Sequence, residues 1–285
     1  MRIKKHSNKN EYILTEDNIW VRNLYNRHAP AFDINQLGKK DYQLLLSNEL
    51  LNKNERYQNI DTEEVHCPYA VIVSDGYDFN NKQEMLAKLP KNVSIIATNG
   101  ALAGWRLVGD NCPNDLLRRI DYFVVNNPYE ECMIYLPRSH RYFPGCIAST
   151  RTNPQFLEEY RGSKFIYIPA MGENYSGPKL DCNYKIDDYR NPICASIGLA
   201  CRFGIQKLLM FCCDDSFADE RPSAIHLENN LWAYEQQLLS HNIIDGYLYW
   251  LKKAKVKLGD HSSGPKLKNA TYIETVEDML EFFEE

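Results

Sequence analysis

Short apolar runs alternate with helix-length amphipathic segments from residue 69 onward. The runs are rich in β-branched and aromatic residues and have the length of buried strands; they lie at 69–74, 93–98, 121–126, 164–169 and 207–213. Amphipathic segments that predict helices occupy 80–89, 101–108, 129–136, 153–160 and 192–203. Strands separated by helices form βαβ units. We therefore predict an α/β fold with a mostly parallel sheet and helices on both faces.

The flanking segments differ from this core in composition. Residues 1–66 are polar and rich in Asn, Lys and Glu, and they predict an N-terminal helical cap on a core domain at 67–275. Within the core, the polar stretch at about 216–241 predicts a lid, followed by a largely helical segment with a strand near its end. Residues 276–285 predict an amphipathic helical tail.

One predicted helix begins and ends with clear capping residues. Asn191 is a favoured N-cap, Pro192 suits the first helical position, and Gly204 suits the left-handed residue after the helix. The first turn of a helix presents N–H groups and a partial positive charge, and Arg190 directly precedes it. These features predict an anion site at the start of the helix.

The strand that follows this helix ends in two aspartates, Asp214 and Asp215. In open α/β sheets ligands bind at the carboxyl ends of the strands. We therefore predict a nucleotide here, with its phosphate at Arg190 and the helix start and its ribose hydroxyls or a metal at the carboxylates. The alternative is a surface ion pair of Arg190 with Asp187 or Asp188, with the two aspartates capping a turn.

The first three predicted strands also end in small polar residues, although each end alone is typical of a simple turn. They are Ser74, Asp75 and Gly76, then Thr98, Asn99 and Gly100, then Asn126, Asn127 and Pro128. Such side chains suit hydrogen bonds to a base and a ribose. The first turn is neither a G-x-G-x-x-G fingerprint nor a Walker loop, which disfavours NAD enzymes and P-loop ATPases.

Composition and charge argue against several classes of partner. The chain has 285 residues and a formal net charge of −5, so it offers no overall basic field for nucleic acid or an anionic membrane. No apolar run approaches the roughly 18 residues of a membrane span, and the N-terminus lacks the apolar core of a secretion signal. We therefore expect a cytoplasmic protein. The nine cysteines form no C-x-x-C pair, and we expect most of them to be reduced and buried.

Three stretches together carry a resemblance to a known family. They are "ATNGAL" (97–102), "IDYFVVNNP" (120–128) and "NPICASIGLACRFGIQKLLMFCCDD" (191–215). Over residues 69–275 their order resembles the 6-hydroxymethylpterin diphosphokinase MptE-like family. It also resembles the relatives of that family, the Maf flagellin glycosyltransferases and the bacterial lipooligosaccharide sialyltransferases. The resemblance implies a Rossmann-like core that binds a nucleotide.

The resemblance also implies roles for individual residues. The Asn-Pro turn of the sialyltransferases carries a nucleotide-contacting asparagine, which corresponds to Asn127, with Asn99 beside it. Those enzymes place a catalytic histidine in or after a mobile lid. His241 has that position, and His226 inside the predicted lid is the second candidate. A histidine with a pKa near neutrality can take a proton from an acceptor hydroxyl.

The leading hypothesis is a glycosyltransferase that takes a sugar from a CMP- or UDP-sugar. Its acceptor hydroxyl belongs to a glycan or, as a lesser alternative, to a modified nucleobase in DNA. Its nucleotide site comprises Asp75, Gly76, Asn99, Asn127, Arg190, Asn191 and Asp214. Arg190 also stabilises the leaving group, and His241 or His226 acts as base.

Two alternatives remain open. The first is a diphosphokinase that transfers pyrophosphate from ATP to a hydroxymethyl pterin, with Mg²⁺ held by Asp214 and Asp215 and by acidic residues of the first turn. The second is a nucleotide-binding protein without catalytic activity.

Overall fold

The computed structural model describes most of the core and parts of both flanks. The described residues are 2–4, 11–13, 39–54, 57–59, 68–74, 76, 79–99, 101, 119–136, 143–169, 185–186, 188, 191–213, 217–218, 221–222, 231–264 and 266–284.

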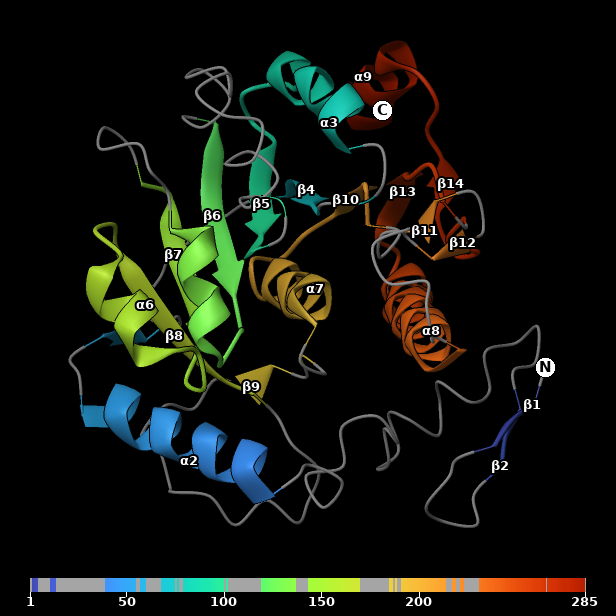
Figure 1. Ribbon diagram of the computed structural model, residues 1–285. Coiled ribbons are helices and arrows are strands. Elements are labelled where there is room, and N and C mark those ends of the chain that lie inside the picture. The colour runs from blue at the N-terminus through green and yellow to red at the C-terminus, as the bar shows by residue number, and fades with distance from the viewer. Residues whose placement is uncertain are drawn as a thin grey trace.

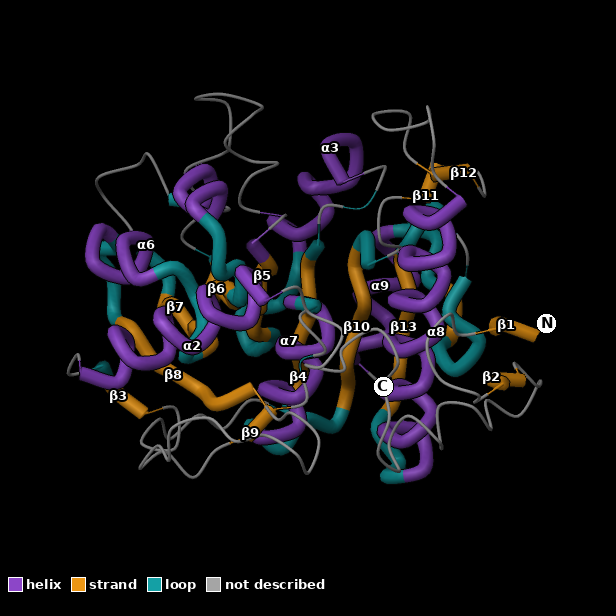
Figure 2. The backbone as a smooth tube through the Cα atoms, turned by 60° about the horizontal axis from the view of Figure 1, so that its bottom comes forward, coloured by secondary structure: helices purple, strands orange, loops and turns teal. Residues whose placement is uncertain are grey.

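A single ten-stranded sheet forms the centre of the molecule. Its order is β14-β13-β10-β4-β5-β6-β7-β8-β3, β9 pairs with β8, and every pairing in it is parallel. The strands cross Figure 2 in this order, from β3 at the left to β13 at the right. The longer strands are β4 (Tyr69–Val73), β5 (Ser94–Thr98), β6 (Ile120–Val125), β7 (Gly145–Ser149), β8 (Lys164–Pro169), β10 (Lys207–Phe211) and β13 (Lys257–His261). The two-residue strands are β3 (Gln58–Asn59), β9 (Lys185–Ile186) and β14 (Thr271–Tyr272).

Helices cover both faces of the sheet because alternate strand residues point to opposite sides. In β4, Ala70 and Ile72 belong to one buried cluster, whereas Val71 and Val73 belong to the other. The first cluster includes α7 (Pro192–Arg202) and α8 (Leu231–Lys253). The second includes α3 (Phe79–Lys82), η4 (Gln83–Lys88), η5 (Glu130–Tyr135), α6 (Pro154–Glu159) and α9 (Val276–Glu284). The predicted fold class is therefore confirmed.

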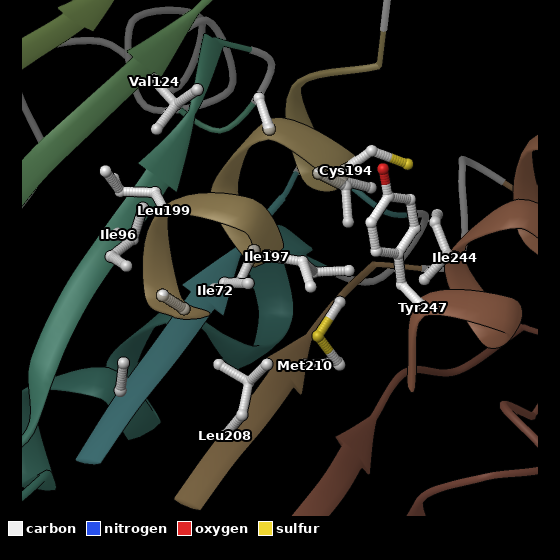
Figure 3. Packing of buried hydrophobic residues seen from close by; sticks show 14 of the residues in the cluster. Ile72, Ile96, Val124, Cys194, Ile197, Leu199, Leu208, Met210, Ile244 and Tyr247 are labelled. Carbon is white, nitrogen blue, oxygen red and sulfur yellow. The ribbon is translucent and has the colours of Figure 1, made fainter. Parts of the chain in front are cut away.

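Helices α7 and α8 lie side by side on one face of the sheet, with α7 against β4, β5 and β6 and α8 against β13 (Figure 2). Figure 3 shows Leu199 of α7 near Ile96 of β5, and Ile197 on the side of α7 that faces Met210 of β10 and Tyr247 of α8. All of the labelled residues are buried, so a single cluster joins the strands to both helices on this face.

The five predicted strands are all present, but β7 was not predicted. Two predicted helices also differ. Most of 129–136 forms the 3-10 helix η5, and most of 80–89 forms η4 after one turn of α3. In η5 the N–H of Cys132 bonds the carbonyl of Tyr129, which is an i→i+3 bond. A segment this short gains little from α-helix propagation. The helix predicted at 101–108 lies outside the described residues, except for Ala101.

The segments outside the predicted core, and the predicted lid, also contain helices and strands. Helix α2 (Lys39–Asn54) agrees with the predicted helical cap, and β3, also within 1–66, pairs with β8. Strands β1 (Arg2–Lys4) and β2 (Glu11–Ile13) pair with each other. In the predicted lid, β11 (Phe217–Ala218) pairs with β12 (Arg221–Pro222), and residues 231–241 belong to α8. The division into cap, core and tail stays a prediction. Among the described residues, no helix has both the length and the apolarity of a membrane span.

Candidate functional site at the carboxyl edge of the sheet

The direction in which the chain adds strands to the sheet reverses between β4 and β10. The chain proceeds outward from β4 through β8 and then returns to the other side of β4 with β10, followed by β13 and β14. In open α/β sheets, ligands bind outside the carboxyl ends of the strands at such a switch point. The residues that follow β4, β10 and their neighbours therefore form the candidate site.

The turns after β4 and β10 are bonded to each other. The N–H of Ser74 donates to the carbonyl of Phe211 (3.1 Å), and the N–H of Gly76 donates to the carbonyl of Cys212 (2.9 Å). Cys212 has φ 53°, which is uncommon for a residue with a side chain. The N–H of Cys213 donates to the Ser262 hydroxyl after β13 (3.1 Å). Gly76 thus reaches the predicted edge, but its N–H is already used within the protein.

The end of β5 supplies a buried polar side chain with an unused acceptor. Thr98 donates through its hydroxyl to Ser74 (3.2 Å), which joins the ends of β5 and β4. Asn99 is only 8% exposed, and within the described part of the chain its Oδ1 has no hydrogen-bond partner. A buried acceptor without a donor costs about 1–3 kcal/mol. Asn99 is therefore suited to accept a hydrogen bond from a ligand.

Two adjacent asparagines follow β6, and they differ in what they contact. The Oδ1 of Asn127 accepts the N–H of Tyr129 (2.9 Å), so this oxygen stabilises a local turn. Its neighbour Asn126 donates through Nδ2 to the carboxylate of Asp188 (3.5 Å). Asn127 can therefore offer a nucleotide its amide nitrogen as a donor and the second lone pair of Oδ1 as an acceptor.

The start of α7 is capped as predicted. Asn191 accepts the N–H of Ile193 through Oδ1 (2.8 Å), Pro192 occupies the first turn, and Gly204 has φ 73° just after the helix. Because the cap uses the N–H of Ile193, an anion near this end would interact mainly with the helix dipole and with other first-turn groups. The helix runs from this edge into β10, so its start belongs to the candidate site.

A buried carboxylate lies close to the start of α7. Asp188 is 4% exposed and accepts a hydrogen bond from the Tyr167 hydroxyl (2.7 Å). Burial raises the pKa of Tyr167 well above its usual value, and the adjacent Asp188 charge raises it further. The phenol therefore stays protonated and donates to Asp188. Asp188 is thus not a surface residue. The alternative pairing of Arg190 with Asp187 or Asp188 stays a prediction, because Arg190 and Asp187 lie outside the described residues.

His241 lies on α8 and is 8% exposed. The helix leads through a short turn into β13 and packs against that strand, so the two run antiparallel. With a rise of about 1.5 Å per helical residue and about 3.3 Å per strand residue, the carboxyl end of β13 is level with roughly residue 244 of α8. His241 thus lies near the level of the carboxyl edge. One turn later, Asp245 accepts the N–H of Asn269 (3.0 Å).

The remaining predicted site residues lie outside the described part of the chain. They are Asp75, Arg190, Asp214, Asp215 and His226. Among the residues that are described, no group of three or more His, Cys, Asp and Glu side chains could hold a metal ion. The predicted metal site at Asp214 and Asp215 stays a prediction.

Sequence reasoning missed a group of buried, hydrogen-bonded residues next to this edge of the sheet. Tyr167 was counted only as part of a strand, Asp188 only as a possible surface partner of Arg190, and Asn126 only as one of the polar strand ends. One local feature did indicate that Asp188 belongs near the site, since it lies three residues before the N-cap of α7. Its contact with Tyr167 connects segments 21 residues apart, which no local pattern reveals.

Comparison with known proteins supports the fold. No protein-family model matches the chain, and no curated protein matches it. A solved Maf glycosyltransferase from Magnetospirillum magneticum AMB-1 has a similar fold, with a TM-score of 0.57 and 13% sequence identity. The match covers 85% of this chain and 41% of that protein, so the chain spans about two fifths of the length of its structural neighbour. The expected likeness to Maf glycosyltransferases is thus confirmed in the fold, and those to the MptE-like proteins and the sialyltransferases stay predictions.

Proposed function

We propose that this protein is a glycosyltransferase that binds a nucleotide-sugar at the carboxyl ends of β4, β5 and β6. The observation that carries the proposal is the gathering of small polar strand ends and a helix start at the switch point of the sheet. The fold likeness to a Maf glycosyltransferase supports the same class of reaction.

The described side chains at this edge suit the uncharged part of a nucleotide. The Oδ1 of Asn99 accepts a hydrogen bond from a ribose hydroxyl or a base amine, and the amide nitrogen of Asn127 donates one. Gly76 allows close approach of the ligand to the turn after β4. Asp75 assists there, and Asp214 binds the ribose hydroxyls in this proposal.

The phosphates require positive charge. We assign them to Arg190 and to the start of α7 at Asn191, where the helix dipole favours an anion. Mg²⁺ assists if Asp214 and Asp215 bind it. The donor is a CMP- or UDP-sugar, and the acceptor is a hydroxyl of a glycan or of a modified nucleobase in DNA.

The transfer step uses a base. The acceptor oxygen attacks the anomeric carbon, the bond from that carbon to the phosphate oxygen breaks, and the nucleoside phosphate leaves with the electron pair. The acceptor proton passes to His241, or to His226 as second candidate. We predict that His241→Ala lowers turnover by about 10²- to 10⁴-fold while donor affinity changes little. Full activity of this variant would remove His241 from the mechanism.

A ligand screen tests the proposal directly. Thermal unfolding is measured with CMP, UDP, GDP and ATP, each with and without Mg²⁺, because a ligand that binds the native state raises the melting temperature. Stabilisation by CMP or UDP and hydrolysis of the matching nucleotide-sugar support the glycosyltransferase. Formation of AMP from ATP, only with Mg²⁺ and a pterin alcohol, would instead indicate a diphosphokinase. Binding without turnover of any nucleotide would indicate a non-catalytic binding protein.

A further inference from the structure

Helix α2 packs on the core through a face that is mainly polar. Asn48, Glu49 and Asn52 are at most 3% exposed, and their spacing places them on one side of the helix. By contrast, Leu50 and Leu51 are 55% and 51% exposed. Leu45 is buried, but apolar burial alone does not explain why this helix lies where it does. Directional hydrogen bonds define its position instead.

The two asparagines bind backbone carbonyls of two loops. Asn48 donates through Nδ2 to the carbonyls of Pro128 (2.9 Å) and Arg151 (3.1 Å). Asn52 donates through Nδ2 to the carbonyls of Thr150 (2.9 Å) and Thr152 (2.8 Å). Pro128 follows β6, whereas residues 150–152 follow β7. Helix α2 therefore binds the carboxyl-end loops of two neighbouring strands.

A buried ion pair reinforces these bonds. Arg151 Nε lies 3.2 Å from Glu49 Oε1, and the Thr150 hydroxyl donates to the same oxygen (3.3 Å). Loss of one partner of a buried pair leaves an uncompensated charge, which is strongly unfavourable. The pair thus favours one position of α2 on the loop after β7.

The loop after β7 is in turn bonded to the loop that carries the candidate asparagines. The N–H of Asn153 donates to the carbonyl of Asn127 (3.0 Å), and the Thr152 hydroxyl donates to the carbonyl of Val125 (3.0 Å). Figure 1 shows α2 on the side toward which the arrowheads of β5 and β6 point. A continuous set of hydrogen bonds therefore connects α2 to the Asn126–Asn127 turn.

We propose that Asn48, Glu49 and Asn52 are positioning residues, and that α2 holds the loops after β6 and β7 in the conformation that presents Asn127 to the ligand. The assignment of that ligand as a nucleotide rests on the proposed function; the effect of α2 on the loops does not. Helix α2 is then a part of the binding site although none of these three side chains contacts the ligand.

Hydrogen exchange of the full-length chain tests the effect on the loops. We compare Asn48→Ala, Asn52→Ala and the double variant with the wild type, and follow peptides that contain the amides of Tyr129 and Asn153. Local exchange reports the free energy of local opening. We expect exchange of these amides to rise by about tenfold or more in the double variant, because up to four hydrogen bonds are lost, while exchange in β4 and β10 stays unchanged. Glu49→Gln keeps the size of the side chain but leaves the buried Arg151 charge without its partner, so it should raise exchange at these amides as well.

Thr275→Ala is the matched control. Its hydroxyl accepts the N–H of Asp278 (3.1 Å) at the exposed start of α9, so it also loses a bond between a side chain and the backbone. We expect its exchange to rise only around α9. Unchanged exchange at Tyr129 and Asn153 in the asparagine variants, or an equal rise throughout the sheet, would overturn the proposal.

Nucleotide affinity separates this inference from the proposed function. If the wild type binds CMP or UDP, the double variant should bind about tenfold more weakly or worse, whereas Thr275→Ala should bind normally. Raised local exchange with unchanged affinity would overturn the positioning role. If the wild type binds no nucleotide, the proposed function fails, and the exchange pattern alone decides whether α2 holds these loops.

Discussion

Two buried tyrosine hydroxyls differ in the charge of the group that accepts their hydrogen bond. Tyr160 donates to the carbonyl of Pro144 (2.6 Å), and Tyr167 donates to the carboxylate of Asp188 (2.7 Å). Both side chains are almost fully buried. Hydrogen bonds to charged groups contribute more than those to neutral groups, so the pair separates the contribution of the Asp188 charge from that of burial.

We predict that Tyr167→Phe lowers the free energy of unfolding by about 2 kcal/mol and Tyr160→Phe by about 1 kcal/mol. Each substitution removes one hydroxyl and keeps the ring, so packing changes little. Urea denaturation at neutral pH measures both values. An equal or larger loss for Tyr160→Phe would mean that Asp188 is not a buried anion.

The same tyrosine predicts a dependence on alkaline pH. Because burial and Asp188 raise the pKa of Tyr167 in the folded protein, its contribution is complete below the unfolded pKa of about 10 and decreases as the pH rises above it. Tyr167→Phe should therefore lose less stability than the wild type between pH 9 and 11. Parallel losses over that range would contradict the raised pKa.

Among the elements, α7 and β9 pack too closely for a side chain at Gly198. A Cβ at this position would lie 2.7 Å from Cγ2 of Ile186, which is attached to the stiff branched carbon of that side chain. Replacing glycine by alanine in a helix gains about 1 kcal/mol, whereas overpacking costs about 1–3 kcal/mol. We predict that Gly198→Ala is destabilising overall by about 1 kcal/mol in urea denaturation. The double variant with Ile186→Leu, which lacks Cγ2, should recover part of the loss; additive losses would show that the contact is not the cause.

The strands that the sequence predicted share strong local features. Strands β4, β5, β6, β8 and β10 are rich in β-branched, aromatic and leucine residues, as expected for strands covered on both faces. Strand β7 reads Gly-Cys-Ile-Ala-Ser and contains a single β-branched residue, so its propensity is weak. It is a strand because β6 and β8 pair with it on both sides. Tertiary pairing overrode local preference here.

The candidate site was predictable where its chemistry is local. The cap at Asn191 and the left-handed Gly204 follow from neighbouring residues, and both were confirmed. The packing of α2 was not predictable, since Asn48 and Asn52 have the spacing of a solvated helix face. Their partners lie 80 to 103 residues away along the chain, and no sequence period records such contacts.

At the scale of the whole molecule, α9 completes one face of the sheet. Met279, Phe282 and Phe283 belong to the same buried cluster as Val71 of β4 and Leu209 of β10. Lys207 at the start of β10 donates through Nζ to the carbonyl of Phe283 (3.0 Å). The last helix therefore covers the strands that form the switch point. The sequence predicted a separate tail at 276–285, whereas this packing favours a helix α9 that folds together with the core.

Phe283→Ala distinguishes a separate tail from an integral helix. If α9 folds with the sheet, loss of this buried ring lowers the free energy of unfolding by about 3–5 kcal/mol, because the cavity lies within the central core. Unfolding followed by tryptophan fluorescence and by circular dichroism should then still give coincident transitions. Glu281→Ala, an exposed position on the same helix, is the control and should change stability by less than about 0.5 kcal/mol. A small effect of Phe283→Ala, or an early transition seen by circular dichroism and not by fluorescence, would instead mean that α9 unfolds separately from the sheet. The stability of β4 and β10 would then come from the rest of the core.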